Sequence, residues 1–552
     1  LSIYKTLSNY QIVLPTNVTI VGKYAFSADM INSYINAMTK IESIALSSVL
    51  ESAGDYAFAG FSGITSLSIP ATLQTLGDYV FAYNKNLESV QSASIVLGDY
   101  MFSHDLKLEN FNNNGQEYLK ATFYDENETY YIYAGGVYTE VVINEFAEGV
   151  TYYRHLDTAI VLGSQFLEAN VGKNVFEYCY SLDNNVVYGV KELALQNAYI
   201  GEFMFYQDRG LTELYIPSNI LKMDNCAFMK CKNISRITIE EGLTYLGDYV
   251  FQETAISELI FPDSLTYMGE GNLKGCDMLD TITIPFVGSQ VGNTNKIDAV
   301  FGWLFGRRTD LDDAETIELL ENSTYQNANN ETVSRFKAIN QKYYSVDEDT
   351  FYIPSKLTTV YITKETTIAR GAFYNCVDLE HIYLPQDTIN RINLYAFYNC
   401  QSLKDMTIPN QITSILAETF NYCSNLEYLN MPFVGGSANA QGADSVFGYI
   451  FGMTSYDNSY EVNQVHSTGT RQANGTITYT YGTTTYYIPK SLKTVLITNT
   501  NMATIPYGAF SDCRFIERLE ITGAVKYVDS YAFYNCQSLV DRSEEHTSEL
   551  QS

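Results

Sequence analysis

One pattern, clearest in residues 395–409, returns along most of the chain. Its skeleton is aromatic-x-Phe-x-x-Cys-x-x-Leu, followed by two residues, two apolar positions separated by one residue, and Pro. Its Phe, called here the box Phe, recurs every 23 or 24 positions, as at Phe373, Phe397 and Phe420. A period of this length predicts a solenoid, in which short modules stack one upon another.

Each module is expected to contain a short strand, a tight corner, a short helical turn and a return loop. The alternation of apolar residues, as in Leu67 and Ile69, indicates a strand with one buried face. A Gly-Asp pair before the box, as at Gly247 and Asp248, permits the tight corner. A single module is too small to form its own core, so we expect neighbouring modules to fold only as a stack.

The regularity of the repeat varies and divides the chain into segments. Repeats are irregular over residues 1–110 and fade over 111–200, which reads either as degenerate repeats or as an inserted β lobe. The terminal residues 542–552 share nothing with the repeat, and we interpret them as a non-native tail on a fragment of a longer protein. The remaining segments are regular repeats at 201–285, an elaborated module at 286–350, regular repeats at 351–432, a second elaborated module at 433–486 and truncated repeats at 487–541.

The two elaborated modules resemble each other, at an offset of about 147 residues. Residues 285–288 recur at 432–435, and residues 301–306 recur at 447–452. Because these hexapeptides recur at a fixed register, we interpret them as apolar clips that pack onto the sheet, rather than as exposed recognition patches. The polar segments 310–341 and 454–485 are expected to be exposed loops of variable length.

The net charge limits the partners of the chain. Acidic residues outnumber basic ones by 63 to 33, which gives a formal net charge of −30. Phosphate backbones and anionic lipids repel such a polyanion, so we expect no nucleic-acid partner. No apolar run reaches the roughly 18 residues that a membrane-spanning helix needs, so we expect no membrane insertion. Residues 1–10 lack the pattern of a secretion signal and give no localisation.

Eight of the nine cysteines lie at one phase of the repeat, three residues after the box Phe or, for Cys276, after Leu273. A residue repeated at one phase of a solenoid is best explained as a small buried residue stacked on its neighbours. Disulfides between adjacent modules, such as Cys400 with Cys423, are the less favoured alternative, because adjacent strands lie within bridging distance. Zinc is not favoured, since no C-x-x-C pair is present.

No pattern predicts catalysis. The five histidines are scattered and match no metal-binding or catalytic motif. The acidic run of Asp310, Asp312, Asp313 and Glu315 lacks the Gly and the terminal Glu of a calcium loop, so a solvated acidic loop is favoured. We therefore expect a protein that is not an enzyme and that holds no cofactor or metal.

The Tyr-Ala-Phe box, the Cys three residues later and the Leu-x-x-Ile-x-Ile-Pro stretch resemble the BspA-like class of leucine-rich repeats. The resemblance is specific over 201–285, 351–432 and 487–541. It implies a right-handed solenoid with a parallel β-sheet on the concave face and short helical turns and loops opposite. It also implies an extracellular or cell-surface protein, since members are typically surface or secreted proteins that act as adhesins or bind host proteins.

The outward positions of the strands are the candidate binding face. They lie between or beside buried apolar residues and are rich in Tyr, Thr and charged side chains, which suit recognition of a protein or a glycan. The candidate residues are Glu213, Tyr215, Arg236, Glu258, Thr283, Tyr361, His381, Tyr383, Asp405, Thr407, Tyr428 and Asn430.

Two functions remain open from the sequence. The favoured one is a monomeric, non-enzymatic binding or adhesion protein whose partner, a protein or a glycan, contacts the concave strand face. The alternative is a structural spacer that presents a terminal domain. A spacer should tolerate replacement of the outward strand residues, whereas a binding protein should not.

Overall fold

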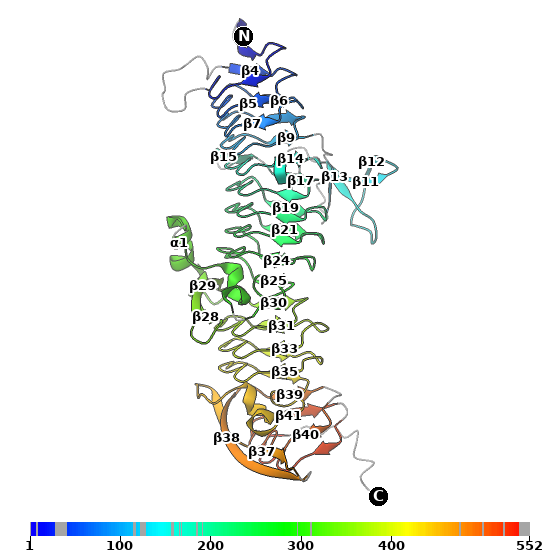
Figure 1. Cartoon of the computed structure of the whole chain (residues 1–552), viewed down its shortest axis with the longest axis vertical. Helices are drawn as coiled ribbons and strands as arrows, with labels where there is room; N and C mark the ends of the chain where they lie inside the picture. The colour runs from blue at the N-terminus through cyan, green and yellow to red at the C-terminus, as the bar shows by residue number, and fades with distance from the viewer. Residues whose placement is uncertain are drawn as a thin grey trace. The chain divides into compact units, whose positions relative to one another are not determined.

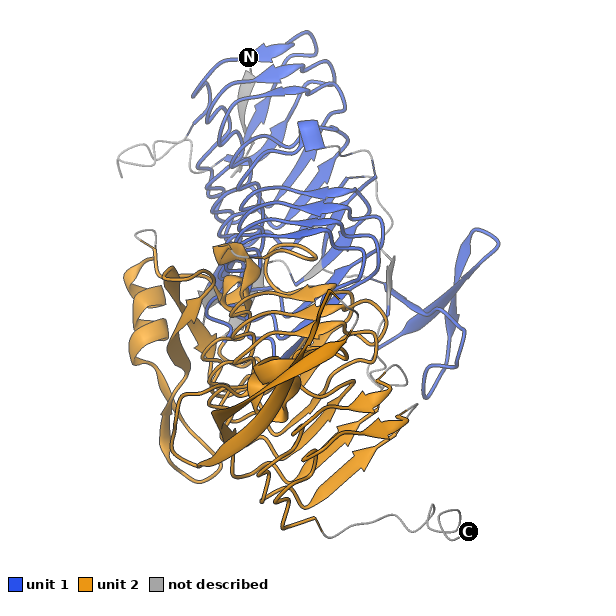
Figure 2. Cartoon of the chain, turned by 60° about the horizontal axis from the view of Figure 1, so that its bottom comes forward, with its two compact units in different colours: residues 1–276 blue, residues 277–552 orange. Residues whose placement is uncertain are grey.

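The computed structural model describes most of the chain, in two compact units, residues 1–276 and 277–552 (Figure 2). The tail at 542–552 lies outside the described residues. The described residues are 2–6, 9–27, 41–113, 118–121, 128–155, 159–164, 166, 168–183, 186–189, 191–294, 296–309, 312–473, 476–498, 502–522 and 525–539.

Each regular module contributes two strands, a longer one of mostly three or four residues and a shorter one of two (Figure 1). Strands of the same kind pair in parallel between neighbouring modules, for example β19 (Glu213–Ile216) with β21 (Arg236–Ile239) and β20 (Lys222–Met223) with β22 (Tyr245–Leu246). The stack of parallel strands confirms the leucine-rich-repeat solenoid expected from the sequence.

In the first unit the longer strands form three groups. β1 runs antiparallel to β2, and β2 pairs in parallel with β4. The members of the three groups are β1 (Ser2–Thr6), β2 (Asn9–Val13) and β4 (Ile41–Ala45); β6 (Ser66–Ile69), β8 (Ser89–Ser92), β9 (Asn110–Asn112), β14 (Ala159–Leu162) and β17 (Glu192–Leu195); and β19 and β21. β23 (Glu258–Ile260) follows β21 in sequence but does not belong to its sheet. The shorter strands are β3 (Ile20–Val21), β5 (Ser52–Ala53), β7 (Thr75–Leu76), β18 (Tyr199–Ile200), β20, β22 and β24 (Tyr267–Met268).

The region 111–200 combines both structures that the sequence left open. β9, β14 and β17 continue the parallel sheet, while an antiparallel lobe projects between β9 and β14 (Figure 1). The ring of Phe102 stacks on that of Phe176 at 5.7 Å, so the repeat closes across the insertion. The other elements of this region are β10 (Tyr118–Lys120), β11 (Tyr130–Ala134), β12 (Val137–Val141) and β13 (Tyr153–His155) of the lobe, η2 (Glu168–Asn170), and the hairpin of β15 (Tyr180–Asp183) and β16 (Val186–Gly189).

In the second unit the longer strands follow one another in one parallel sheet. They are β25 (Thr281–Ile284), β30 (Thr359–Ile362), β32 (His381–Tyr383), β34 (Asp405–Thr407), β36 (Tyr428–Met431), β39 (Thr494–Ile497) and β41 (Arg518–Ile521). The shorter strands are β31 (Thr367–Ile368), β33 (Arg391–Ile392), β35 (Ser414–Ile415), β40 (Thr504–Ile505) and β42 (Tyr527–Val528).

The box Phe residues form the centre of the core in each unit. In the first unit their rings stack from module to module, with centroids 5.2 Å apart between Phe205 and Phe228. In the second unit Phe373, Phe397 and Phe420 continue the same arrangement at 5.5 and 5.3 Å. Because a ring such as that of Phe397 is fully buried between two others, its contribution depends on both neighbouring modules.

The box itself is a turn without helical structure, which corrects the short helical turn expected from the sequence. Residues two before and two after the box Phe have positive φ, for example 60° at both Tyr395 and Asn399. These left-handed residues turn the backbone amides toward the next module, so that the Phe397 amide donates to the Thr419 carbonyl at 3.0 Å. The Asn399 amide donates likewise to the carbonyl of Asn421 at 2.8 Å. The stacking geometry overrides the ordinary preference of Tyr and Asn for negative φ.

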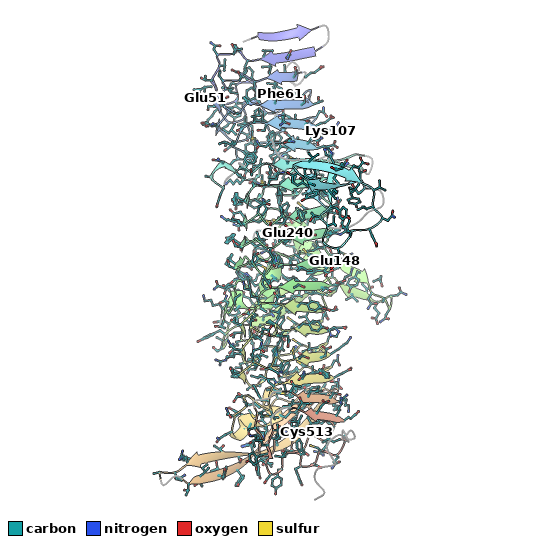
Figure 3. All side chains as sticks on the ribbon, turned by 90° about the vertical axis from the view of Figure 1, so that its right-hand side faces the viewer. Glu51, Phe61, Lys107, Glu148, Glu240 and Cys513 are labelled. Carbon is teal, nitrogen blue, oxygen red and sulfur yellow. The ribbon has the colours of Figure 1, made fainter. Side chains whose placement is uncertain are left out.

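The repeated cysteines are buried, except for the half-buried Cys536, and most of them donate a hydrogen bond along the stack. The thiol of Cys400 donates to the carbonyl of Phe373 at 3.2 Å, and that of Cys423 to the carbonyl of Phe397 at 3.1 Å. This contact explains why a small residue with a donor recurs three positions after the box Phe. Burial raises the pKa of the Cys423 thiol to about 12, so the thiol stays protonated. Cys513, also buried, is labelled in Figure 3.

The polar insertions are folded, which corrects their interpretation as exposed loops. In the first elaborated module, β28 (Phe336–Lys342) and β29 (Glu348–Pro354) form a ribbon, and in the second β37 (Ser459–Arg471) and β38 (Ile477–Pro489) form a longer one. The other elements of the elaborated modules are η3 (Ile297–Ala299), η4 (Phe301–Phe305), α1 (Ala314–Asn322), β26 (Thr324–Gln326), β27 (Thr332–Ser334), η5 (Gly442–Ser445) and η6 (Phe447–Ile450).

One buried glutamine fixes each ribbon to the repeat stack. The side chain of Gln464 accepts from the Gly448 amide at 2.6 Å and donates to the carbonyls of Ala509 and Ser511 at 3.3 and 3.2 Å. Gln341 makes the equivalent contacts to the Gly302 amide and to the carbonyls of the module that follows it. The hexapeptides at 301–306 and 447–452 lie at the base of the ribbons, and their Phe side chains are buried, as expected for clips.

Two aspartates occupy the cysteine position and make the stability of the first unit depend on pH. Asp105 and Asp208 are fully buried, and burial raises the pKa of each well above its ordinary value. A raised folded pKa means that stability is greatest below the pKa of the unfolded chain and is lost as pH rises through the folded pKa. Asn84 fills the same position one module earlier, where its amide donates to the Phe58 carbonyl at 3.3 Å.

We therefore expect Asp105→Asn to stabilise the first unit at pH 7, by about 1 kcal/mol or more, since the amide supplies a donor without a buried charge. The gain should shrink toward pH 4. Thermal unfolding between pH 4 and 8 measures it, with Asp387→Asn at an exposed site as the control. Equal effects of the two substitutions at every pH would contradict the assignment.

The buried thiols give a second prediction. In the folded chain we expect the eight buried cysteines to be unreactive toward a thiol reagent and only the half-buried Cys536 to react slowly. Denaturation should release all nine thiols. Mass spectrometry without reductant provides the check, and a Cys400–Cys423 bridge would show that the alternative interpretation is correct.

Candidate binding surface

In the second unit the predicted outward residues form two parallel rows across the sheet. Strand pairing places Thr283, Tyr361 and Tyr383 side by side in one row, and Thr407 and Asn430 farther along it. The second row contains His381, Asp405 and Tyr428 in register. All eight are exposed or partly exposed, because alternate residues of each strand point into the core.

The centre of these rows is a stacked pair of exposed tyrosines. The rings of Tyr361 and Tyr383 are 4.6 Å apart and nearly parallel, at 11°, and the residues are 41% and 42% exposed. Burial, and after it Asp405 and Tyr361, raises the pKa of Tyr383. Its hydroxyl is therefore protonated at neutral pH and can donate to a bound molecule. The pair offers a rigid, flat contact area with polar ends.

A histidine and a carboxylate flank the tyrosine pair. The Nδ1 atom of His381 lies 2.7 Å from Oδ2 of Asp405, and the histidine ring lies 6.2 Å from that of Tyr383. The two groups lack the geometry of a hydrogen bond, so their attraction is an ion pair that exists only when the histidine is protonated. Tyr361, Tyr383, His381 and Asp405 are called the aromatic-acidic cluster below.

In the first unit the predicted residues are less available for binding. The Glu213 carboxylate accepts from the Arg236 guanidinium at 2.9 Å across β19 and β21, so these charges satisfy each other. Tyr215 packs on Ala159, Val161 and Ala194, and burial followed by its hydrogen bond to Glu240 raises its pKa. Tyr215 therefore serves the packing of the adjacent strands more than an exposed surface.

The first unit also has a depression that the repeat pattern alone did not predict. It lies between β21 and β23, has a volume of about 490 Å³, and is lined by Arg236, Glu258 and the exposed Ile260, among others. β21 and β23 share no ladder of hydrogen bonds. The signal in the sequence is a shortened return segment: Leu259 follows Phe251 by eight residues, whereas Ile237 follows Phe228 by nine.

Within the described ranges no three His, Cys, Asp or Glu residues are placed to hold a metal ion. Of the acidic run, Asp313 caps the N-terminus of α1 by accepting from the Thr316 amide at 2.9 Å, and Asp312 accepts from the Thr309 amide at 2.8 Å. Asp310 lies outside the described residues. The run thus begins a helix, which corrects the loop expected there. No helix among the described residues is long and apolar enough to span a membrane.

Stacked two-stranded modules with a continuous strand face define a class of repeat scaffold. The family model described as BspA type Leucine rich repeat region (6 copies) matches residues 2–129, 198–295, 318–438 and 475–545. These ranges exceed half of the chain, so the chain belongs to the BspA-type leucine-rich repeat family. Proteins of this family are repeat scaffolds that generally bind other proteins.

Solved structures show similar proteins at low identity. A leucine-rich repeat protein from Bacteroides ovatus ATCC 8483 is 18% identical, with a TM-score of 0.36, over 78% of this chain and 86% of that one. A leucine rich cell surface protein from Faecalibacterium prausnitzii A2-165 is 14% identical, with a TM-score of 0.23, over 95% of both chains. A comparison with curated proteins found no match.

Proposed function

We propose that the chain is an extracellular or cell-surface binding protein, and that its partner is a protein that contacts the strand face of the second unit. The observation that carries the proposal is the aromatic-acidic cluster, in which two exposed tyrosines are stacked beside a histidine and a carboxylate. Fixed aromatic rings lose little conformational entropy on binding, which makes them effective contact residues.

The shape of the face favours a protein over a small saccharide. Thr283, Thr407 and Asn430 extend the row on both sides of the tyrosine pair, so the polar surface continues across successive strands. A partner with an extended surface can use the whole row, whereas a small ligand is usually enclosed in a pocket. The general protein-binding role of the family supports the same choice.

The test uses the purified chain on arrays of extracellular-matrix proteins and of glycans. We expect a protein ligand, and we expect the double substitution Tyr361→Ala and Tyr383→Ala to weaken its binding by about tenfold or more, because such a pair is typical of binding hot spots. Tyr344→Ala is the matched control, since Tyr344 is an exposed tyrosine in the turn between β28 and β29.

Three outcomes would contradict the proposal. Binding to glycans alone would show that the partner class is wrong. Protein binding that the double substitution leaves unchanged would show that the surface is wrong. The absence of any ligand would favour the spacer that the sequence left as the alternative. Circular dichroism of each variant controls for folding, which exposed substitutions should disturb little.

A further inference from the structure

Among the described residues, neither edge of the ribbon of β37 and β38 pairs with another strand. The two strands form a sheet of their own, paired from Ser459 with Pro489 to Arg471 with Ile477 (Figure 1). An unpaired strand edge presents a row of N–H and C=O groups, to which another strand can bind.

The edge of β37 is largely occupied by its own chain. The amides of Asn463 and Val465 donate to the side chains of Asp512 and Ser511, both at 3.0 Å. The amide of Gly469 donates to the side chain of Gln441 at 3.1 Å. These odd-numbered amides therefore point away from β38. In an antiparallel pair, the backbone N–H and C=O groups of the directly opposite residues also point away from the partner strand.

The residues of β38 whose N–H and C=O groups point away from β37 are consequently the odd-numbered ones. At the base of the ribbon, the Tyr487 amide donates to the carbonyl of Gly452 at 3.0 Å, in agreement with this phase. Beyond the base, the amides at 477, 479, 481, 483 and 485 have no hydrogen-bond partner in the described part of the chain. The open edge thus runs from Ile477 to Thr485, a length of about 30 Å.

This edge lacks the features that usually prevent strands from associating. Residues 476–489 contain no charged side chain, and their only proline is the last residue. Ile477, Tyr479 and Tyr481 are 56%, 54% and 67% exposed. Natural edge strands are commonly protected by Lys, by Pro or by inward charges, and uncharged Tyr and Thr strands pair readily.

The ribbon of the first elaborated module is a shorter version of the same structure, and charged residues protect its strand edge against pairing. It ends at the pair of Lys342 with Glu348, whereas the second ribbon continues for six more residue pairs beyond the equivalent position. Lys342 and Glu348 approach within 3.9 Å, and Asp349 adds another charge on β29. The added part of the second ribbon thus lengthens β38 without adding any charge to it.

We propose that the edge of β38 from Ile477 to Thr485 pairs antiparallel with the same edge of a second copy of the chain. Full overlap of the two edges places the two-fold axis at Tyr481, because Ile477 and Thr485 are equally distant from it in sequence. Tyr479 then lies opposite Thr483 of the second copy, and Ile477 opposite Thr485. Aromatic and β-branched residues are favourable cross-strand partners.

A second copy fits this edge because the edge is complementary to itself: in the antiparallel register, Tyr479 and Ile477 of each copy face Thr483 and Thr485 of the other. The net charge of −30 opposes the approach of two copies, but the paired strands add no repulsion, since residues 476–489 carry no charge. The five outward residues on each side would exchange about ten backbone hydrogen bonds. The dimer differs from the monomer expected from the sequence, and it does not depend on the proposed partner of the strand face.

The association can be measured by light scattering of the purified chain over a range of concentrations. We expect a mass that rises from one chain to two. Tyr481→Pro removes one outward amide and leaves the bonds within the ribbon, and Thr483→Lys places a charge on the edge, so each should abolish the dimer. Thr470→Lys places the same charge on exposed β37, and this control should leave the dimer intact.

A cross-link tests the two-fold axis directly. In a Cys536→Ser background, which removes the one partly exposed cysteine, we expect Tyr481→Cys to form an interchain disulfide on oxidation and Thr470→Cys to form none. A mass of one chain at every concentration would overturn the proposal. Assemblies that grow beyond two chains would overturn it also, as would a dimer that Thr483→Lys does not affect.

Discussion

The structure depends on hydrogen bonds that run from one module to the next through the left-handed turns on both sides of the box Phe. Each turn directs an amide toward the carbonyl of the following module, as between Phe397 and Thr419. A non-glycine residue at positive φ costs about 1–2 kcal/mol, so the turn is stable only where a neighbouring module supplies the carbonyl. The same neighbour buries the Phe ring. Local conformation and stacking are therefore parts of one cooperative unit, and neither forms alone.

The cysteine position shows how this constraint selects side chains. The site is small, buried and faces the carbonyl of the preceding box Phe, so it accepts a residue with a donor, and Cys, Thr and Asn all occur there. The Cys276 thiol donates to the carbonyl of Phe251 in the preceding module at 3.3 Å, whereas Thr254 donates to that same carbonyl, at 3.0 Å, from within its own module. Where an elaborated module precedes, the amide of Gln341 or Gln464 contacts the cysteine sulfur instead. The recurrence of cysteine thus follows from packing and hydrogen bonding without any need for a metal.

In such a scaffold, function resides in surface groups that are not needed to pack the core. In the second unit the strand face carries stacked tyrosines beside a histidine and a carboxylate, and the elongated ribbon carries an uncharged open edge. The two surfaces differ in chemistry. The strand face presents side chains, and specificity there comes from their identity, whereas the edge of β38 presents mainly backbone groups, and its specificity comes from register and symmetry.

The sequence by itself determined the repeat, the parallel strands and which residues face outward, because a solenoid places each phase of the repeat in the same environment. It could not show that Tyr215 is packed against neighbouring strands, or that Glu213 and Arg236 satisfy each other, since these contacts join residues from separate modules. It also could not show that the polar insertions fold. Their strands are stabilised by single buried glutamines whose partners lie far along the chain, and only the tertiary structure brings those partners together.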